Sequence, residues 1–185
     1  RYFEEVCQVP RPSKKEEKII AYLKAFGAKH NLETKVDEAG NVLIKKPATP
    51  GKENLQTVVL QSHIDMVCEK NNDVQHDFLT DPIETEIDGE WLKAKGTTLG
   101  ADNGIGVATE LAILADDSIE HGPLECLFTV DEETGLTGAF ALKEGFMSGD
   151  ILLNLDSEDE GEIFIGCAGG IDSVAEFTYK AVSYT

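Results

Sequence analysis

The sequence predicts an α/β sandwich built on a mixed, largely parallel β-sheet. Short apolar runs begin at Thr57, Leu124 and Ile151 and predict buried strands, and the uninterrupted run at 57–60 is typical of a strand buried on both faces. Segments with helical periodicity lie between these runs, so strands and helices alternate along the chain. The 185 residues are enough for one domain with a substantial hydrophobic core.

The N-terminal part of the chain is expected to form a helix followed by a β-hairpin. A capping-box pattern at Ser13 and Glu16, ahead of apolar residues at helical spacing, predicts a helix over residues 13–26. Alternating side chains over residues 32–36 and 42–44 predict two strands joined by a turn. The remaining elements are expected in this order: a strand at 57–60, a second hairpin formed by 83–87 and 91–94, a helix at 104–115, a strand at 124–130, a helix near 137–144, strands at 151–155 and 162–166, and an alternating segment at 172–179.

The composition argues against nucleic acid or a membrane as a partner. The chain has 35 acidic and 16 basic residues, and the resulting net charge of −19 repels phosphate backbones and anionic lipids. This acidic excess serves solubility, or part of it gathers carboxylates to hold cations. No apolar run approaches the roughly 18 residues of a membrane span. The four cysteines form no C-x-x-C pair, which favours free thiols in a cytoplasmic protein.

Side chains that commonly bind metal ions follow each of the three buried strands. His63 and Asp65 follow the first strand, Glu132 and Glu133 the second, and Asp156 the third. Because sites in open α/β sheets form beyond the carboxyl ends of the strands, we expect these side chains to meet at one place. The sequence therefore predicts a metal site at this edge of the sheet.

Asp102 is expected to join this site from the start of a helix. It lies in the glycine-rich segment 96–106, where Gly100 and Gly104 allow the backbone to approach closely. The helix N-terminus favours a negative charge, and a carboxylate placed there could bridge two cations. An ordinary N-cap role for Asp102 is the alternative.

The spacing within these segments indicates a division of roles. A metal-bound imidazole usually donates its other N–H to a carboxylate, and alternation on an extended segment puts Asp65 on the same side as His63. Of Glu132 and Glu133, one could bind a metal while the other stays uncoordinated as a base. Spacing alone does not decide which, and Asp131 extends the run to three acids. Taken singly, the histidine could make an ordinary hydrogen bond, and the acidic run could be a solvated loop.

Other motif interpretations agree less well with the sequence. Gly104-Ile-Gly106 lacks the third glycine and the preceding strand of a nucleotide-binding loop. The acidic segment from Asp156 resembles the start of a calcium loop, but its twelfth position is Cys167 rather than Glu. The sequence contains no G-x-S-x-G nucleophile elbow.

Four motifs, in this order and spacing, resemble the di-zinc peptidase and deacylase family, which includes carboxypeptidase G, peptidase T and the carnosine-type dipeptidases. They are His-x-Asp at 63–65, Gly-x-Asp-x-Gly at 100–104, Glu-Glu at 132–133 and Asp156 after a strand. The resemblance runs over nearly the whole chain. It implies a three-layer α/β/α catalytic domain of the zinc-peptidase type.

The resemblance also implies a role for each residue of the site. The implied zinc ligands are His63, Asp102, Glu133 and Asp156, with Asp102 bridging the two metals. The implied catalytic residues are Glu132, as general acid and base, and Asp65, as the partner that orients the imidazole. Two zinc ions would occupy a complete site, although cobalt or manganese would accept the same ligands. The implied reaction is the hydrolysis of dipeptides, typically Xaa-His, by a metal-activated water.

The chain departs from the family pattern in one respect. The second zinc of the family requires a histidine that follows an inserted lid domain, and no histidine occurs after His121. We therefore expect residues 1–168 to be the N-terminal portion of the catalytic domain, truncated before that insertion. Residues 169–185 are expected to be the start of the inserted lid or dimerisation domain, or a return strand. This portion alone is expected to have an incomplete second metal site and little peptidase activity, and the full-length protein is expected to form a homodimer.

Two alternative functions would use the same residues. An amide deacylase acting on N-acyl amino acids would need the same metals and the same base. A non-catalytic cation-binding fragment would use the ligands but would not need an uncoordinated glutamate beside them.

Overall fold

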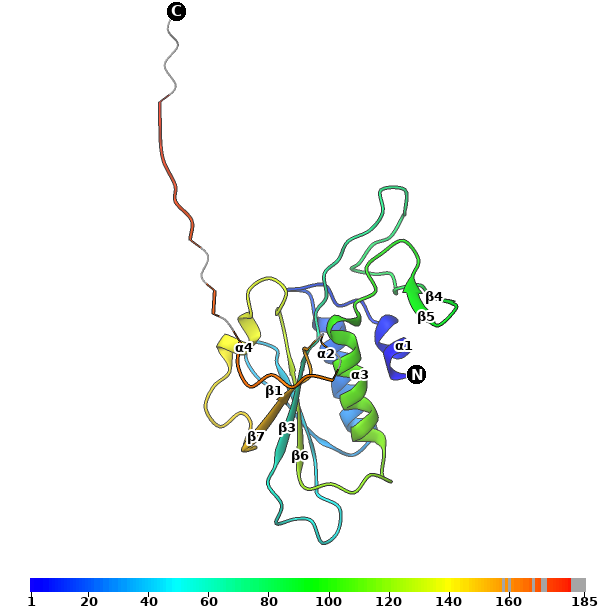
Figure 1. Cartoon of the computed structure of the whole chain (residues 1–185), viewed down its shortest axis with the longest axis vertical. Helices are drawn as coiled ribbons and strands as arrows, with labels where there is room; N and C mark the ends of the chain where they lie inside the picture. Colours follow the sequence, from blue (N-terminus) through cyan, green and yellow to red (C-terminus); the bar gives the residue numbers. More distant parts are fainter. Residues whose placement is uncertain (158, 160, 168, 171–172, 181–185) are drawn as a thin grey trace, which may run out of the picture.

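The computed structural model describes residues 1–157, 159, 161–167, 169–170 and 173–180. The centre of the molecule is a five-stranded sheet (Figure 1), whose strands in spatial order are β1 (Glu33–Val36), β2 (Val42–Lys46), β6 (Leu124–Thr129), β3 (Val58–His63) and β7 (Ile151–Asn154). Strand β3 runs parallel to β6 and β7, whereas β2 runs antiparallel to β1 and β6. The sheet is therefore mixed, and the first predicted hairpin forms its antiparallel edge.

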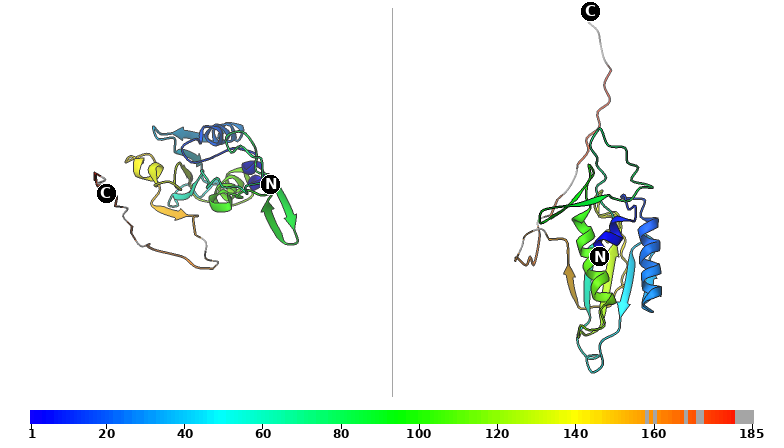
Figure 2. Two further views of the ribbon diagram at one scale, coloured as in Figure 1. Left: turned by 90° about the horizontal axis from the view of Figure 1, so that it is seen from above. Right: turned by 90° about the vertical axis from the view of Figure 1, so that its right-hand side faces the viewer.

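Two long helices cover one face of this sheet (Figure 2). They are α2 (Glu17–Lys29) and α3 (Ala101–Ala115). Leu23 from α2 and Leu111 from α3 join Phe128 of the sheet in the main hydrophobic core, and all three side chains are fully buried. This apolar packing supplies most of the favourable free energy that orders the domain.

The opposite face of the sheet packs against α4 (Thr137–Ala141) and the loop that follows it. Val59 and Leu127 point to this side and pack against Leu142 and Phe146. Because β3 and β6 are covered on both sides, most of their side chains are buried in both directions, which explains why apolar residues follow one another at 58–60 and 126–128. The three-layer α/β/α architecture is confirmed.

The predicted cap of the first long helix is wrong. Helix α2 begins at Glu17, and Lys14 has a left-handed backbone with φ of 64°. The hydroxyl of Ser13 donates to the carboxylate of Asp65 (2.8 Å) instead of capping the helix. An additional helix, α1 (Tyr2–Cys7), precedes this turn and is too short to show a helical period in the sequence.

A second, two-stranded sheet projects from the body of the molecule (Figure 1). Its strands β4 (Thr85–Asp88) and β5 (Trp91–Ala94) pair antiparallel. Gly89 lies in the turn with φ of 64°, a conformation that glycine adopts without steric cost. The second predicted hairpin is therefore confirmed.

Two strands predicted near the C-terminus do not form in the described residues. Residues 161–167 contain no strand, and Ile163 and Ile165 are exposed rather than packed in a core. Residues 169–170 and 173–180 also form neither helix nor strand, and position 172 lies outside the described residues. An extended segment becomes a strand only when a neighbour pairs with its backbone N–H and C=O groups. In the described part of the chain, neither segment has such a partner.

Cys7, Cys68, Cys126 and Cys167 all carry free thiols. Cys7 and Cys126 are buried in the two larger hydrophobic clusters, where they pack as small apolar side chains. Within the described ranges, no helix combines the length and the apolar character needed to cross a bilayer.

Candidate metal centre

The residues predicted to bind metal meet at the edge of the sheet where β3, β6 and β7 end. His63 is the last residue of β3, and only 1% of it is exposed. Glu132 and Glu133 follow β6, and Asp156 follows β7. Because β3 pairs in parallel with both neighbours, the three strand ends lie side by side.

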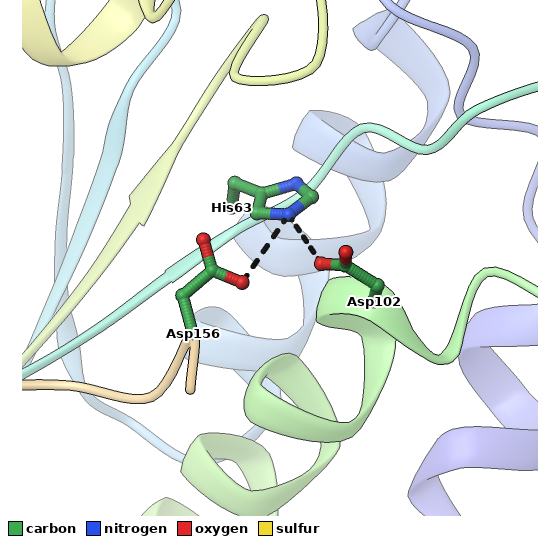
Figure 3. A group of neighbouring side chains, drawn as sticks. All are labelled: His63, Asp102 and Asp156. Carbon is green, nitrogen blue, oxygen red and sulfur yellow. Dashed lines mark hydrogen bonds and ion pairs between the residues drawn. The ribbon is translucent and has the colours of Figure 1, made fainter. Parts of the chain in front are cut away.

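Two aspartates lie directly beside the imidazole of His63 (Figure 3). The Nε2 atom of His63 is 2.9 Å from Oδ1 of Asp102 and 3.7 Å from Oδ1 of Asp156. The ligand atoms of these three residues all lie within 4.8 Å of one another. One divalent cation could therefore contact all three side chains.

Two glutamates approach the same imidazole from the loop after β6. Oε2 of Glu132 lies 3.9 Å from Nε2 of His63. His63, Glu132 and Glu133 form a second group whose ligand atoms lie within 4.8 Å of one another. Since both groups share His63, four carboxylates converge on one imidazole.

Asp131, the first acid of this run, belongs to neither of these groups. Its carboxylate accepts hydrogen bonds from the hydroxyls of Thr134 and Thr137. Its backbone N–H donates to Oε1 of Glu16 (3.0 Å). These bonds hold the loop closed and leave the two glutamates that follow to face the site.

The backbone around Asp102 is not that of an ordinary helix start. Helix α3 follows Gly100, whose φ is 69°, and Asp102 has non-helical angles (φ −80°, ψ 115°). The peptide bond between Asp102 and Asn103 is cis. Asn103 caps the helical segment that follows, because its Oδ1 accepts a hydrogen bond from the backbone N–H of Gly106 (3.0 Å). The N-cap alternative for Asp102 is therefore wrong, and its carboxylate faces His63 instead.

Asp156 is turned toward the site by the end of β7. The side-chain Oδ1 of Asn154 accepts a hydrogen bond from the backbone N–H of Asp156 (2.9 Å). The backbone N–H of Leu155 donates to the carbonyl oxygen of Gln61 on β3 (2.8 Å), which continues the pairing of the two strands. The chain therefore stays beside β3 up to the residue that precedes Asp156.

Asp65 supports the centre from the protein interior. It is fully buried, and its Oδ1 accepts hydrogen bonds from Nδ1 of His63 (3.2 Å) and the backbone N–H of Glu132 (3.0 Å). Its Oδ2 accepts from the Ser13 hydroxyl (2.8 Å) and the backbone N–H of Glu133 (3.2 Å). Burial alone would raise the pKa of Asp65, but these hydrogen bonds lower it to about 2. One carboxylate thus orients the imidazole and both glutamates.

We expect Asp65→Asn to weaken zinc binding by about 10- to 100-fold. The side-chain NH2 of asparagine would face hydrogen-bond donors, because all partners of Asp65 donate to it. Calorimetric titration of the metal-free full-length protein with zinc measures the affinity. Ser13→Ala removes a single one of these bonds and should change the affinity much less. Unchanged affinity in Asp65→Asn would contradict this role.

The charges around His63 favour a bound cation. Burial would lower the pKa of His63, but hydrogen bonds to Asp65 and Asp102 and the charge of Asp156 raise it to about 9. Burial also raises the pKa of Asp156 and of both glutamates, and neighbouring carboxylates add to this effect. A divalent ion would relieve the repulsion among these acids. An imidazole nitrogen with carboxylate oxygens is a donor set that zinc, cobalt and manganese accept.

Three residues that support the centre are missing from the site predicted from the sequence. Ser13 matches a helix cap, although its hydroxyl binds Asp65. Asn103 is of a residue type favoured at helix N-caps, which is a usable signal for its observed role. Arg11 belongs to no motif, although its guanidinium contacts the backbone on both sides of the centre.

Comparison with known proteins extends the similarity seen in the motifs. Residues 59–179 match the profile of peptidase family M20/M25/M40. A cytosol non-specific dipeptidase from Escherichia coli (strain K12) is 55% identical over 170 residues, which cover 92% of this chain and 35% of that protein. The crystal structure of an aminoacylhistidine dipeptidase from Vibrio alginolyticus has a TM-score of 0.84 and 57% identity, covering 86% of this chain and 33% of that one.

A more distant solved structure has the same fold. An aminopeptidase from Bacillus cereus has a TM-score of 0.71 and 28% identity, covering 85% of this chain and 42% of that one. The chain spans about a third of the length of its Escherichia and Vibrio relatives. The segment matched by the family profile is more than half of the chain and contains His63, Asp102, Glu132, Glu133 and Asp156. The chain therefore belongs to peptidase family M20/M25/M40.

Proposed function

We propose that the full-length protein is a metal-dependent dipeptidase that hydrolyses the peptide bond of dipeptides, typically Xaa-His. The observation that carries this proposal is the convergence of four carboxylates on the imidazole of His63. The two relatives above 50% identity are named as dipeptidases, one non-specific and the other for aminoacylhistidine substrates. Both names support dipeptides as the substrates, and the second name supports dipeptides of the Xaa-His class.

The proposed metals are two zinc ions that share Asp102. In this assignment His63 and Asp156 bind one ion, Asp102 bridges, and Glu133 binds the other. The 2.9 Å and 3.7 Å distances from His63 to the two aspartates support the first ion. Among the described residues, neither ligand group that includes His63 contains a second histidine. We therefore propose that another part of the full-length protein completes the second site.

Glu132 is the proposed general acid and base. Bound zinc would supply Lewis acidity that polarises the scissile carbonyl and acidifies the attacking water. Glu132 would accept the proton of that water and later donate it to the leaving amine. Burial raises the pKa of Glu132, which brings this carboxyl closer to neutral pH, where proton exchange is efficient. The hydrogen bond from its backbone N–H to Asp65 keeps it beside the site.

The proposed setting is the cytoplasm, and the proposed assembly is a homodimer. The net charge of −19 disfavours binding to nucleic acid or anionic membranes, and the thiols are free. The Escherichia coli relative is named as a cytosol protein. The homodimer rests on the family resemblance and stays a prediction, which sedimentation of the full-length protein tests.

Zinc titration of the metal-free full-length protein, followed by dipeptide assays, tests the proposed function. We expect two tightly bound ions per chain and hydrolysis of Xaa-His dipeptides. Asp102→Ala should weaken zinc binding by more than about 100-fold, because a lost ligand costs more than the roughly 10- to 100-fold effect of a lost outer partner. Asp117→Ala, which changes a 98% exposed aspartate just beyond the other end of α3, is the matched control and should bind zinc normally.

Each other outcome of this experiment points to a different function. Absence of zinc binding, or binding that survives Asp102→Ala, would contradict the metal centre. Hydrolysis of N-acyl amino acids without hydrolysis of dipeptides would indicate an amide deacylase. Tight binding without hydrolysis of either substrate would indicate a cation-binding protein.

A further inference from the structure

Arg11 lies on the loop between α1 and α2, and its guanidinium is buried behind the metal centre. Only 2% of the residue is exposed. Its Nη1 donates to the carbonyl oxygens of Ile64 (3.1 Å) and Asp65 (2.8 Å), and its Nη2 donates to the carbonyl oxygen of Gly100. One planar group thus joins two backbone segments that are distant in the sequence.

Each of these segments carries a candidate metal ligand. Ile64 directly follows His63, and Gly100 lies two residues before Asp102. The side chains of these two ligands meet at 2.9 Å, measured from Nε2 of His63 to Oδ1 of Asp102. The guanidinium therefore joins the two backbone segments that carry His63 and Asp102, through hydrogen bonds to other residues of those segments.

Two glycines leave the space that the guanidinium occupies. A Cβ atom at Gly104 would lie 2.8 Å from Nη2 of Arg11 and 3.0 Å from Cε2 of Phe3. A Cβ atom at Gly100 would meet the same Nη2 and the sulfur of Met66. The glycines around Asp102 therefore accommodate Arg11, which the sequence pattern does not reveal.

The interactions of Arg11 differ from those of an ordinary buried ion pair. In the described part of the chain, it forms no ion pair with a carboxylate, and its hydrogen bonds go to backbone carbonyls. Burial lowers the pKa of Arg11, while the negative charges of Asp65 and Glu133 favour its charged form. Burying a cation is costly, and here that cost is offset by hydrogen bonds that tie the two segments together.

We propose that Arg11 is a positioning residue of the metal centre, which holds the two segments at the separation that lets His63 and Asp102 share one ion. This inference rests on the proposed function, because it takes the centre to bind metal. A forked guanidinium donates in several fixed directions at once, whereas a lysine ammonium is a compact point charge without that geometry. Ligands held in place before the ion arrives require less ordering when it binds.

Lys46 on β2 provides a matched control for the loss of a buried cation. It is 7% exposed, and its Nζ donates to the carbonyl oxygens of Ile113 (3.1 Å) and Asp116 (2.7 Å) at the far end of α3. Lys46→Met and Arg11→Met therefore both remove hydrogen bonds from a buried cation to backbone carbonyls at opposite ends of one helix. Lys46→Met also removes a 3.7 Å ion pair with the exposed Asp117.

Zinc affinity of the metal-free full-length protein, measured by competition with a chelator, separates positioning from general stability. We expect Arg11→Met and Arg11→Lys each to weaken zinc binding by about 10- to 100-fold. Lys46→Met and Arg11→Met should both lower the thermal midpoint, but Lys46→Met should leave zinc affinity unchanged. Arg11→Lys keeps the positive charge, so it takes the place of Arg11→Met in the comparison with Lys46→Met if Arg11→Met does not fold.

Hydrogen exchange of the metal-free protein gives a second readout that needs no ion. Backbone amides of residues 100–104 should exchange faster in Arg11→Lys than in the unmodified protein or in Lys46→Met. Unchanged zinc affinity in Arg11→Lys, or unchanged exchange over 100–104, would overturn the proposal. If the unmodified protein binds no zinc, the proposed function fails, and the exchange result still decides whether Arg11 holds this segment.

Discussion

Glu132→Gln is expected to lower kcat for dipeptide hydrolysis by about 10²- to 10⁴-fold while zinc binding stays unchanged. Glutamine has nearly the shape of glutamate, but it cannot accept a proton from water and return it to the leaving amine. The backbone N–H of residue 132 would still donate to Asp65, so the loop keeps its place. Steady-state kinetics on an Xaa-His dipeptide, with zinc content determined on the same samples, measures both quantities.

Glu133→Gln is the matched comparison, because it makes the same chemical change one residue away. Its backbone N–H also donates to Asp65 (3.2 Å), so both variants keep their loop contacts. If Glu133 binds the second ion, Glu133→Gln should lose zinc affinity, and added zinc should restore part of its turnover. Loss of zinc in Glu132→Gln, together with normal zinc and low turnover in Glu133→Gln, would reverse the two assignments.

The free energy of unfolding is expected to carry a contribution from Glu110 that falls as the pH rises, and Glu110→Gln should remove it. Glu110 on α3 is fully buried, and neither of its carboxyl oxygens has a hydrogen-bond partner among the residues that the structure describes. Burial raises its pKa well above the ordinary value, and the polar neighbours Ser62 and Cys126 offset only part of this effect. We therefore expect the folded protein to hold a neutral carboxylic acid in its core.

The sign of this effect follows from proton binding. Above the ordinary pKa of glutamate, the unfolded chain releases the proton of Glu110 while the folded protein keeps it. The folded state then binds more protons than the unfolded state, so stability falls as the pH rises. The slope is at most about 1.4 kcal/mol per pH unit, and it ends when the folded-state pKa is reached.

Urea unfolding of the metal-free full-length protein between about pH 5 and pH 8 measures this contribution. The stability of Glu110→Gln minus that of the unmodified protein should increase with pH, because the glutamine does not titrate. The contributions of other titrating groups cancel in this difference as long as they lie apart from Glu110. Glu90→Gln makes the same chemical change in the exposed turn of the β4–β5 hairpin and is the matched control. A difference for Glu110→Gln that stays constant with pH would contradict a buried neutral carboxyl.

Many features of the centre could be predicted because they depend on short stretches of sequence. The apolar runs before His63, Glu132 and Asp156 identify three strands, and parallel strands end at the same edge of a sheet. The first two strands are buried as predicted, but β7 is an exposed edge strand, because no described strand pairs with its outer side. The residue types that follow those runs are metal ligands in their own right. Their convergence within 4.8 Å is the geometric result of these two local properties.

Other features could not be predicted, because a local pattern has more than one possible partner. Ser13 has the residue type and spacing of a helix cap, but its hydroxyl reaches Asp65 on a different segment. Asp131 has the same chemistry as the glutamates beside it, but its carboxylate binds two threonines and belongs to neither ligand group that includes His63. The apolar alternation at 162–166 predicts a strand, which does not form without a neighbouring strand to pair with.

The sequence by itself determined the fold class, both hairpins and the set of side chains able to hold a metal, because periodicity and ligand chemistry are carried by neighbouring residues. Only the tertiary structure decided how those side chains are supported. Arg11 bonds to carbonyls 53 and 89 residues further along the chain, and Asp65 binds the backbone of Glu132 67 residues away. Such contacts depend on how distant segments pack in three dimensions, so a local sequence pattern does not predict them.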